Sequence, residues 1–408
     1  MKSQAPVVEP SRCRLHQSCH RHVRFPRNER LATQYGWDIQ LYSQRVEDIP
    51  GITFPSNSDS SLGTGRIVWH RVSQIPGPHL VKFIWWFLAN HIRRRRDRSS
   101  QNTHPDVTYS PGINCLDADA IIVHMVFHEF YARVRAELRL RSLPLRTWPV
   151  ILHRRLYYNL IMFLERRVYS NSKVRLAAVS QLVASQLSTY FGRADVAIIP
   201  SAVDTSRFSC SSRLARRPRS RALFNFSDDD FVLLLIGNDW KVKGLDQLLR
   251  AIEVNPNLPL RLLVVGRDES SLYATRLRLS KIESRVTFQQ PSSDVLQFYA
   301  AADAYVGPSL QDSFGLPVLE AMACGLPVIS SVRSGVSAFI THGQNGLLLR
   351  DPERPEELVA LLKQLFEDNS LQQKLGVAAA ETAAMHTWDR NAELAQIFLV
   401  AAAIRPSF

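Results

Sequence analysis

The sequence predicts an α/β protein with two doubly wound, Rossmann-like domains that face each other across a cleft. Its 408 residues exceed one ordinary core, because a domain typically has roughly 150 residues. Hydrophobic residues make up 45% of the chain, which is enough for buried cores and excludes a disordered protein. Short apolar segments alternate with helical ones, most clearly in the second half. Ligands bind at the carboxyl ends of the strands in such domains, so the cleft is the expected site.

In the second half, strand and helix segments follow one another regularly. The strand segments are 231–236, 261–265, 285–288, 304–306 and 328–330. The helical segments are 243–253, 270–281, 292–301 and the stretch around 318–324, followed by two helical stretches toward the C-terminus. Near-continuous apolar strands between helices indicate a parallel sheet that is covered on both faces.

The first half repeats this alternation more faintly. Its strand segments are 38–42, 106–109, 120–124, 175–179 and 196–200, and its helical segments are near 81–96, 152–169 and 181–191. Residues 1–30 are rich in Arg, His, Cys and Pro and contain no apolar run of strand length. We therefore expect the first strand and its glycine-rich turn to be missing. The chain divides into an atypical segment 1–30, a first domain 31–203, a second domain 204–388 and a final segment 389–408.

The positive charge of the chain is concentrated in its first half. The whole chain has 50 Lys and Arg residues against 37 Asp and Glu residues. Residues 1–203 carry 28 basic and 14 acidic residues, whereas residues 204–408 carry 22 and 23. This asymmetry favours an anionic acceptor, an anionic membrane surface or a nucleic acid as the partner of the first half. No recognised nucleic-acid-binding module accompanies the charge, so a nucleic acid is not expected.

The sequence also predicts where the protein resides. It contains no run of about 18 apolar residues and lacks the charged, apolar and small-residue order of a signal peptide. Its five cysteines are scattered along the chain, which fits reduced thiols. We expect a cytoplasmic protein. The stretch 83–96 joins an apolar, Trp-bearing segment to four consecutive arginines. It is either a packed helix with a solvated basic end or a patch that contacts the inner face of the plasma membrane.

The most informative motif lies in residues 308–329. Gly315 allows close approach of the backbone to a ligand, and Pro317 is suited to the first turn of a helix. The motif therefore predicts a strand, a tight loop and a short helix whose N-terminal N–H groups suit a phosphate or nucleotide. Two carboxylates, Asp312 and Glu320, flank the helix start. They can accept hydrogen bonds from different hydroxyl groups of one ligand, such as a sugar and a ribose.

This motif resembles that of the retaining family 4 glycosyltransferases of the GT-B fold. Their hallmark is a Glu, seven residues and a second Glu in a Phe-Gly-Leu-Pro context. The resemblance implies that Asp312 contacts the donor sugar and Glu320 the ribose of the nucleotide. The chain departs from the family at position 312, where Asp is one methylene shorter than Glu.

Further motifs support the resemblance. Residues 199–208 are similar to the family's link between domains, and residues 236–251 to its Gly-Arg…Lys-Gly segment, in which Arg and Lys bind the donor diphosphate. Lys243 matches that lysine, but Asn238 stands where Arg is usual. Lys241 can supply the missing charge, since its spacing is similar to that of bacterial lipopolysaccharide-core glucosyltransferases. Similar short motifs occur at 264–268, 334–337 and 342–348, and 387–388 resembles the start of the final helix that crosses back to the first domain.

Together these motifs imply a complete donor site. Its members are Gly237, Lys241, Lys243, Asp312, Ser313, Phe314, Gly315, Leu316 and Glu320. The donor implied is a UDP- or GDP-linked sugar, and no further cofactor is expected. Relatives in this family stabilise the departing diphosphate with basic side chains and helix N-termini, without a metal ion. We therefore expect no metal site, and we interpret Asp117 and Asp119 as turn or cap residues.

A histidine in the first domain completes the implied catalytic set of His124, Asp312 and Lys243. Members of the family often place a histidine at the end of a central strand, facing the reacting sugar. His124 follows the apolar segment 120–123 and takes that position, and His128 is a weaker second candidate. As a bare pattern, His124 is equally consistent with a core histidine.

Three functions remain open at this stage. The first is a retaining glycosyltransferase that acts on a glycan or lipid-linked acceptor in cell-envelope polysaccharide or lipopolysaccharide synthesis. The second is a catalytically impaired or N-terminally truncated relative that binds a nucleotide or partner without transfer, favoured by the missing first strand, Asp312 and Asn238. The third is a phosphorylase or synthase that uses the same fold.

Overall fold

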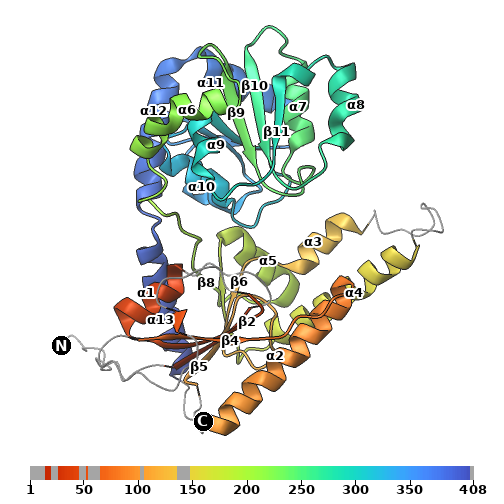
Figure 1. Cartoon of the computed structure of the whole chain (residues 1–408), viewed down its shortest axis with the longest axis vertical. Helices are drawn as coiled ribbons and strands as arrows, with labels where there is room; N and C mark the ends of the chain where they lie inside the picture. Colours follow the sequence, from red (N-terminus) through yellow and green to blue (C-terminus); the bar gives the residue numbers. More distant parts are fainter. Residues whose placement is uncertain are drawn as a thin grey trace. The chain divides into compact units, whose positions relative to one another are not determined.

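The structure is a computed structural model that describes residues 14–19, 26–45, 52–53, 65–101, 105–135 and 148–404. Its internal contacts divide the chain into two compact units (Figure 1). Unit 1 comprises Met1–Val179, Val183–Ile199 and Asn391–Phe408. Unit 2 comprises Ser180–Leu182 and Pro200–Arg390. Each unit is a Rossmann-like α/β domain with its own parallel sheet, as the alternation of segments predicted.

Unit 1 is built on an eight-stranded parallel sheet with the order β3-β4-β2-β1-β5-β6-β7-β8. Its strands are β1 (Arg14–Cys19), β2 (Asp38–Ser43), β3 (Ile52–Thr53), β4 (Ile67–Arg71), β5 (Val107–Ser110), β6 (Ala120–Val123), β7 (Arg175–Ala178) and β8 (Ala197–Ile198). Its helices are α1 (Pro26–Tyr35), α2 (His79–Gln101), α3 (Phe127–Val134), α4 (Trp148–Tyr169), α5 (Gln181–Phe191) and, across the boundary at residue 390, α13 (Trp388–Ala403). The strand order reverses between β1 and β5, which makes this sheet doubly wound.

The structure corrects the expectation that the first strand is missing. β1 lies at the centre of the sheet and pairs in parallel with β2 on one side and β5 on the other. Its sequence, Arg-Leu-His-Gln-Ser-Cys, has none of the apolar continuity expected of a central strand. Backbone hydrogen bonds to two neighbours define this strand, and such tertiary pairing overrides weak local propensity. Residues 20–25, where the glycine-rich turn was sought, lie outside the described residues.

The last helix contributes to unit 1. Asn391, near the start of α13, accepts a hydrogen bond of 2.6 Å from Arg27 Nε of α1. Further along α13, Gln396 accepts one from the indole nitrogen of the buried Trp37. These contacts join the two ends of the chain within one core.

Unit 2 is built on a six-stranded parallel sheet with the order β11-β10-β9-β12-β13-β14. Its strands are β9 (Phe231–Ile236), β10 (Leu260–Val265), β11 (Val286–Gln289), β12 (Ala304–Gly307), β13 (Val328–Ser331) and β14 (Leu347–Leu349). Its α-helices are α6 (Cys210–Leu223), α7 (Leu245–Glu253), α8 (Ser271–Leu279), α9 (Leu296–Ala301), α10 (Leu316–Ala323), α11 (Pro355–Glu367) and α12 (Asn369–Ala384), with short 3-10 turns at Glu283–Arg285 and Gly335–Phe339. The strand order reverses between β9 and β12.

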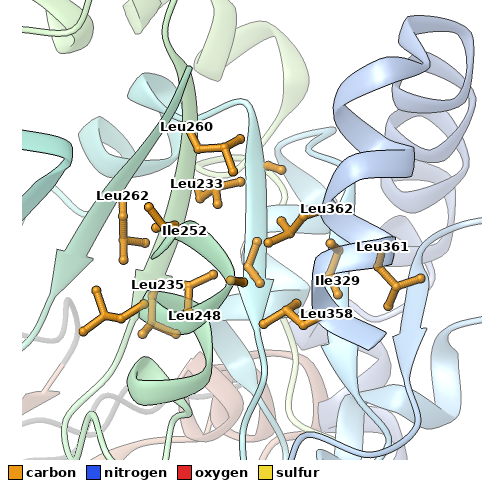
Figure 2. Packing of buried hydrophobic residues seen from close by; sticks show 14 of the residues in the cluster. Leu233, Leu235, Leu248, Ile252, Leu260, Leu262, Ile329, Leu358, Leu361 and Leu362 are labelled. Carbon is orange, nitrogen blue, oxygen red and sulfur yellow. The ribbon is translucent and has the colours of Figure 1, made fainter. Parts of the chain in front are cut away.

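Aliphatic side chains form the core of unit 2. Figure 2 shows Leu233 and Leu235 of β9 beside Leu248 of α7 and Leu358 of α11. The two helices pack against each other as well as on the sheet. All residues of β12 and β13 are buried, so neither strand alternates between buried and exposed residues. This rigid core fixes the loops that leave the carboxyl ends of β9 and β12.

Candidate functional site

The predicted donor residues of unit 2 come together where its strand order reverses. β9 and β12 are neighbours in the sheet. After β9 the chain continues to β10 on one side, and after β12 it continues to β13 on the other. Loop 237–244 leaves the end of β9, and loop 308–315 leaves the end of β12. In doubly wound sheets the crevice formed by two such loops is the usual ligand site.

Two glycines allow these loops to approach each other. Gly244 has a positive φ of 84°, and a Cβ atom there would lie 2.1 Å from the carbonyl oxygen of Pro308 in the other loop. Gly237 has a φ of 154°, and its Cβ atom would lie 3.0 Å from Cε of Lys243. A side chain at either position would push the loops apart or displace the lysine. The glycines thus direct Lys243 toward loop 308–315.

Lys243 forms an ion pair with Asp312. Lys243 Nζ lies 2.5 Å from Asp312 Oδ2, and the two side chains are 21% and 17% exposed. The backbone of Asp312 is fixed in turn, because its N–H donates to Arg333 and its carbonyl accepts from Gly335, both at 3.0 Å. The pair therefore places one cation and one carboxylate, both partly buried, where the two loops meet.

The helix that follows loop 308–315 begins as the motif predicted. Gly315 is the N-cap of α10 with a φ of 90°, and Pro317 occupies the first turn. A Cβ atom at Gly315 would lie 2.4 Å from the hydroxyl oxygen of Ser334, so only glycine fits there. Phe314 is buried beneath this turn, whereas Leu316 is exposed.

Glu320 lies one turn into α10 and is held by a buried tyrosine. The hydroxyl of Tyr299 in α9 donates a hydrogen bond of 2.6 Å to Glu320 Oε2. Tyr299 is fully buried, and burial together with the nearby Glu320 carboxylate raises its pKa. The hydroxyl therefore keeps its proton and orients the carboxylate. Sequence reasoning did not single out Tyr299, because a lone tyrosine in an apolar helix gives no motif.

Asn238 and Asp268 hold the loop after β9 in place through hydrogen bonds to backbone N–H groups. Asn238 Oδ1 accepts a 3.0 Å hydrogen bond from the backbone N–H of Arg267 and so ties the loop after β9 to the loop after β10. Asp268 accepts hydrogen bonds from the backbone N–H groups of Asp239 and Trp240. Lys241 is exposed on the same loop. The side chain of Asn238 thus orders this loop.

In unit 1, His124 follows β6 directly, as expected for the strand-end histidine. Its side chain is exposed to solvent, yet protein atoms crowd it at longer range. This desolvation and the positive charge of Arg27 lower the pKa of His124 to about 4. The imidazole is therefore neutral near pH 7 and can exchange hydrogen bonds with hydroxyl groups.

His128, the second histidine candidate, pairs with a buried carboxylate. Its Nδ1 lies 2.7 Å from Oε2 of Glu165, a residue of α4 with 2% exposure. The same carboxylate accepts hydrogen bonds from the backbone N–H groups of Phe127 and His128, at 2.7 and 3.1 Å. Glu165 thus caps α3 and fixes its start beside His124.

The two aspartates that could suggest a metal site also have structural partners. Asp117 forms ion pairs with Arg94 and Arg98 of α2, and Asp119 accepts a 2.8 Å hydrogen bond from the backbone N–H of Thr108. Within the ranges that the structure describes, no group of three or more His, Cys, Asp or Glu side chains is placed to hold a metal ion. Among the same residues, no helix has both the length and the apolar character needed to cross a membrane.

Two Rossmann-like units, each with its own parallel sheet, are the fold of the GT-B class of proteins. Residues 216–382 match the family model described as Glycosyl transferases group 1. The match lies within unit 2, which therefore carries a domain similar to this family.

Solved structures share the fold over nearly the whole chain. The lipopolysaccharide glycosyltransferase WaaG is 18% identical with a TM-score of 0.72, and the comparison covers 94% of this chain and 99% of WaaG. Sucrose-phosphate synthase of Thermosynechococcus elongatus is 18% identical with a TM-score of 0.71 and coverages of 97% and 100%. HepE of Anabaena, solved with UDP and glucose, is 17% identical with a TM-score of 0.65, covering 95% of this chain and 100% of HepE.

Curated relatives match a shorter part of the chain. The D-inositol 3-phosphate glycosyltransferase of Paenarthrobacter aurescens is 29% identical over 247 residues, which are 56% of this chain and 58% of that protein. The protein of the same name from Stackebrandtia nassauensis is 32% identical over 213 residues, or 48% and 47%. The chain spans about half the length of these relatives.

Proposed function

We propose that this protein is a metal-independent, retaining glycosyltransferase that moves a sugar from a UDP- or GDP-linked donor to a glycan or lipid-linked acceptor. The observation that carries the proposal is the meeting of Lys243 and Asp312 at the sheet reversal of unit 2, with Glu320 on the helix that follows. These positions are the ones that the family motif assigns to the diphosphate, the donor sugar and the ribose, with Asp in place of Glu at 312.

Each residue has a distinct task in this proposal. Lys243 and Lys241 stabilise the negative charge that develops on the departing diphosphate, and the N–H groups at the start of α10 assist them. Asp312 accepts hydrogen bonds from donor-sugar hydroxyls, and Glu320 accepts them from the ribose. His124 exchanges hydrogen bonds with the reacting sugar in its neutral form. Donor binding replaces the contact between Lys243 and Asp312 with contacts to phosphate and sugar.

The place of action proposed is the cytoplasm, at the inner face of the plasma membrane, in cell-envelope polysaccharide or lipopolysaccharide synthesis. Arg95 and Arg96 of α2 are exposed and available to anionic lipid, whereas Arg93 pairs with Asp97, and Arg94 is 1% exposed and paired with Asp117. The basic patch proposed for the membrane therefore consists of Arg95 and Arg96, two fewer arginines than the sequence suggested.

A second candidate function is a relative that binds nucleotide without transferring sugar. Asn238 favours it, because a neutral side chain engaged with the backbone stands where the family has an arginine. The ion pair between Lys243 and Asp312 favours it too, because donor binding must first separate the two groups.

Thermal unfolding with UDP, GDP, ADP and their sugar conjugates tests the donor site. A ligand at 100 times its dissociation constant adds about 2.7 kcal/mol to the free energy of unfolding. We expect one nucleotide to raise the melting temperature of the wild type and of Glu367→Ala, an exposed control in α11. The shift should disappear in Glu320→Ala. An equal shift in Glu320→Ala would remove its ribose role, and binding without sugar transfer to any acceptor would favour the second candidate.

A further inference from the structure

We propose that an aromatic pocket in unit 1 binds the aliphatic chain of a phosphate-bearing, lipid-linked acceptor. This inference rests on the proposed function, since it names the class of acceptor. The pocket has a volume of about 780 Å³ and lies between α3, α4 and the N-terminus of α2. A volume of this size is typical of a ligand site.

The lining of the pocket suits a hydrocarbon chain. Phe127 and Phe130 of α3 and Val150, Tyr157 and Tyr158 of α4 form most of its wall. Phe127 contacts both tyrosine rings, with ring centroids 6.4 and 5.1 Å away, so the wall is a packed aromatic cluster. Each methylene group that leaves water for such a surface contributes about 0.8 kcal/mol. The pocket can therefore bind a chain by burial alone.

The pocket adjoins the surroundings of His124. Met125, Phe127 and Tyr157 line the pocket and also a second cavity of about 250 Å³. His124 and Glu165 line this second cavity, together with the loop after β5. A chain in the larger pocket would thus leave the head group of the same molecule beside His124.

A single cation at the pocket gives it charge complementarity to a phosphate. Arg154 of α4 lines the pocket, and its guanidinium lies over the ring of Tyr158 at 5.9 Å from the ring centroid. Its Nη2 donates a 3.2 Å hydrogen bond to the Tyr158 hydroxyl. Arg154 has no acidic partner among the residues that the structure describes. An arginine in this state is suited to bidentate contact with phosphate oxygens.

The helices beside the pocket expose apolar side chains toward solvent. On α2, Val81, Trp85 and Leu88 are exposed and lie three or four residues apart, which places them on one face of the helix. On α4, Leu152 and Leu156 are exposed in the same spacing. Such faces next to arginines are typical of surfaces that contact a membrane, where a lipid-linked acceptor is found.

Calorimetric titration with monomeric decyl phosphate tests the pocket without any sugar transfer. Val150 is 62% exposed, so Val150→Glu introduces a carboxylate at the pocket with little effect on folding. The matched control is Phe163→Glu, since Phe163 lies on the same helix, is 63% exposed and does not line the pocket. We expect decyl phosphate to bind the wild type and Phe163→Glu with equal affinity. Its affinity for Val150→Glu should be lower by about tenfold or more.

Two further titrations separate the chain from the phosphate. Inorganic phosphate should bind much more weakly than decyl phosphate. Arg154→Gln should weaken the binding of decyl phosphate and leave the binding of decanol unchanged. No binding of decyl phosphate to folded wild type, or an equal loss in both glutamate variants, would overturn the inference. A dimer that Val150→Glu converts to a monomer would also overturn it, because the pocket would then be an interface between copies.

Failure of this inference is distinguishable from failure of the proposed function. Decyl phosphate binding does not involve the crevice of unit 2, and the nucleotide shift does not involve the pocket of unit 1. Decyl phosphate binding without any nucleotide shift would overturn the proposed function and leave a lipid site. A nucleotide shift with no decyl phosphate binding would overturn the lipid site and leave the donor site.

Discussion

The two parallel sheets of this protein are both doubly wound, but the side chains at the carboxyl ends of their strands differ in chemistry. In unit 2 the loops after β9 and β12 bring together Lys243 and Asp312, a charged pair. In unit 1 the loop after β5 and His124 after β6 border a cavity lined largely by aromatic and aliphatic side chains. The comparison indicates that side chains at the strand ends, and not the topology, set the chemistry that each sheet edge offers to a ligand.

The largest effect expected is on sugar transfer in Lys243→Ala. Removing a group that stabilises charge in the transition state typically costs about 100-fold to 1000-fold in rate. The melting temperature should change little, because the lysine is partly exposed and its loss leaves only Asp312, also accessible to water. Steady-state kinetics with the donor identified by thermal shift measure the rate, with Lys363→Ala, an exposed lysine of α11, as the control. Equal rates in Lys243→Ala and the control would show that the charged pair of unit 2 has no role in sugar transfer.

In unit 1 the corresponding change is Glu165→Ala, which should reduce stability. The buried carboxylate satisfies two backbone N–H groups at the start of α3 and the ring of His128. A buried donor left unsatisfied costs about 1–3 kcal/mol, so urea unfolding should show a clear loss. Glu129→Ala, a more exposed carboxylate of α3 paired with Arg133, serves as the control and should lose far less. Equal losses would show that the start of α3 is held by other contacts.

Tyr299→Phe tests the donor site of unit 2, with a smaller effect expected than for Lys243→Ala. The change removes the hydrogen bond to Glu320 and keeps the ring packed in the core. A hydrogen bond to a charged group contributes about 1.5–3 kcal/mol, and we expect about a tenfold loss of nucleotide affinity with sugar transfer at saturating donor nearly unchanged. Titration with nucleotide measures the affinity. A general loss of stability with unchanged affinity would make Tyr299 a core residue only.

Sequence patterns predicted unit 2 more closely than unit 1, for a physical reason. Strand β9 matches the expected segment 231–236, because six consecutive apolar residues between helices have few other structures available. Strand β1 was missed because its mostly polar residues depend on neighbouring strands for pairing, and the short strand β4 was not expected either. The alternation of strand and helix segments was enough to predict the fold class. Strands β1 and β4 could be located only from the tertiary structure.

The candidate site shows the same division between local and distant information. Lys243, Asp312 and Glu320 carry a motif that is readable in order along the chain, and so does His124 at a strand end. Tyr299 and Glu165 act through contacts over 21 and 37 or more residues, and no local pattern announces them. The aromatic pocket has the same origin, since its walls come from three helices separated in sequence.

The smallest effect expected concerns the basic end of α2. Arg96→Ser should weaken binding to anionic vesicles about fivefold, since one arginine near an anionic surface contributes about 1 kcal/mol. Arg94→Ser should act differently, because Arg94 is buried and paired with Asp117, so its loss leaves a carboxylate without its closest partner and lowers the melting temperature. Vesicle co-sedimentation at two salt concentrations separates the two, because contact with lipid through Arg96 weakens as salt rises. Equal co-sedimentation of the wild type and Arg96→Ser would leave this end of α2 as a solvated face.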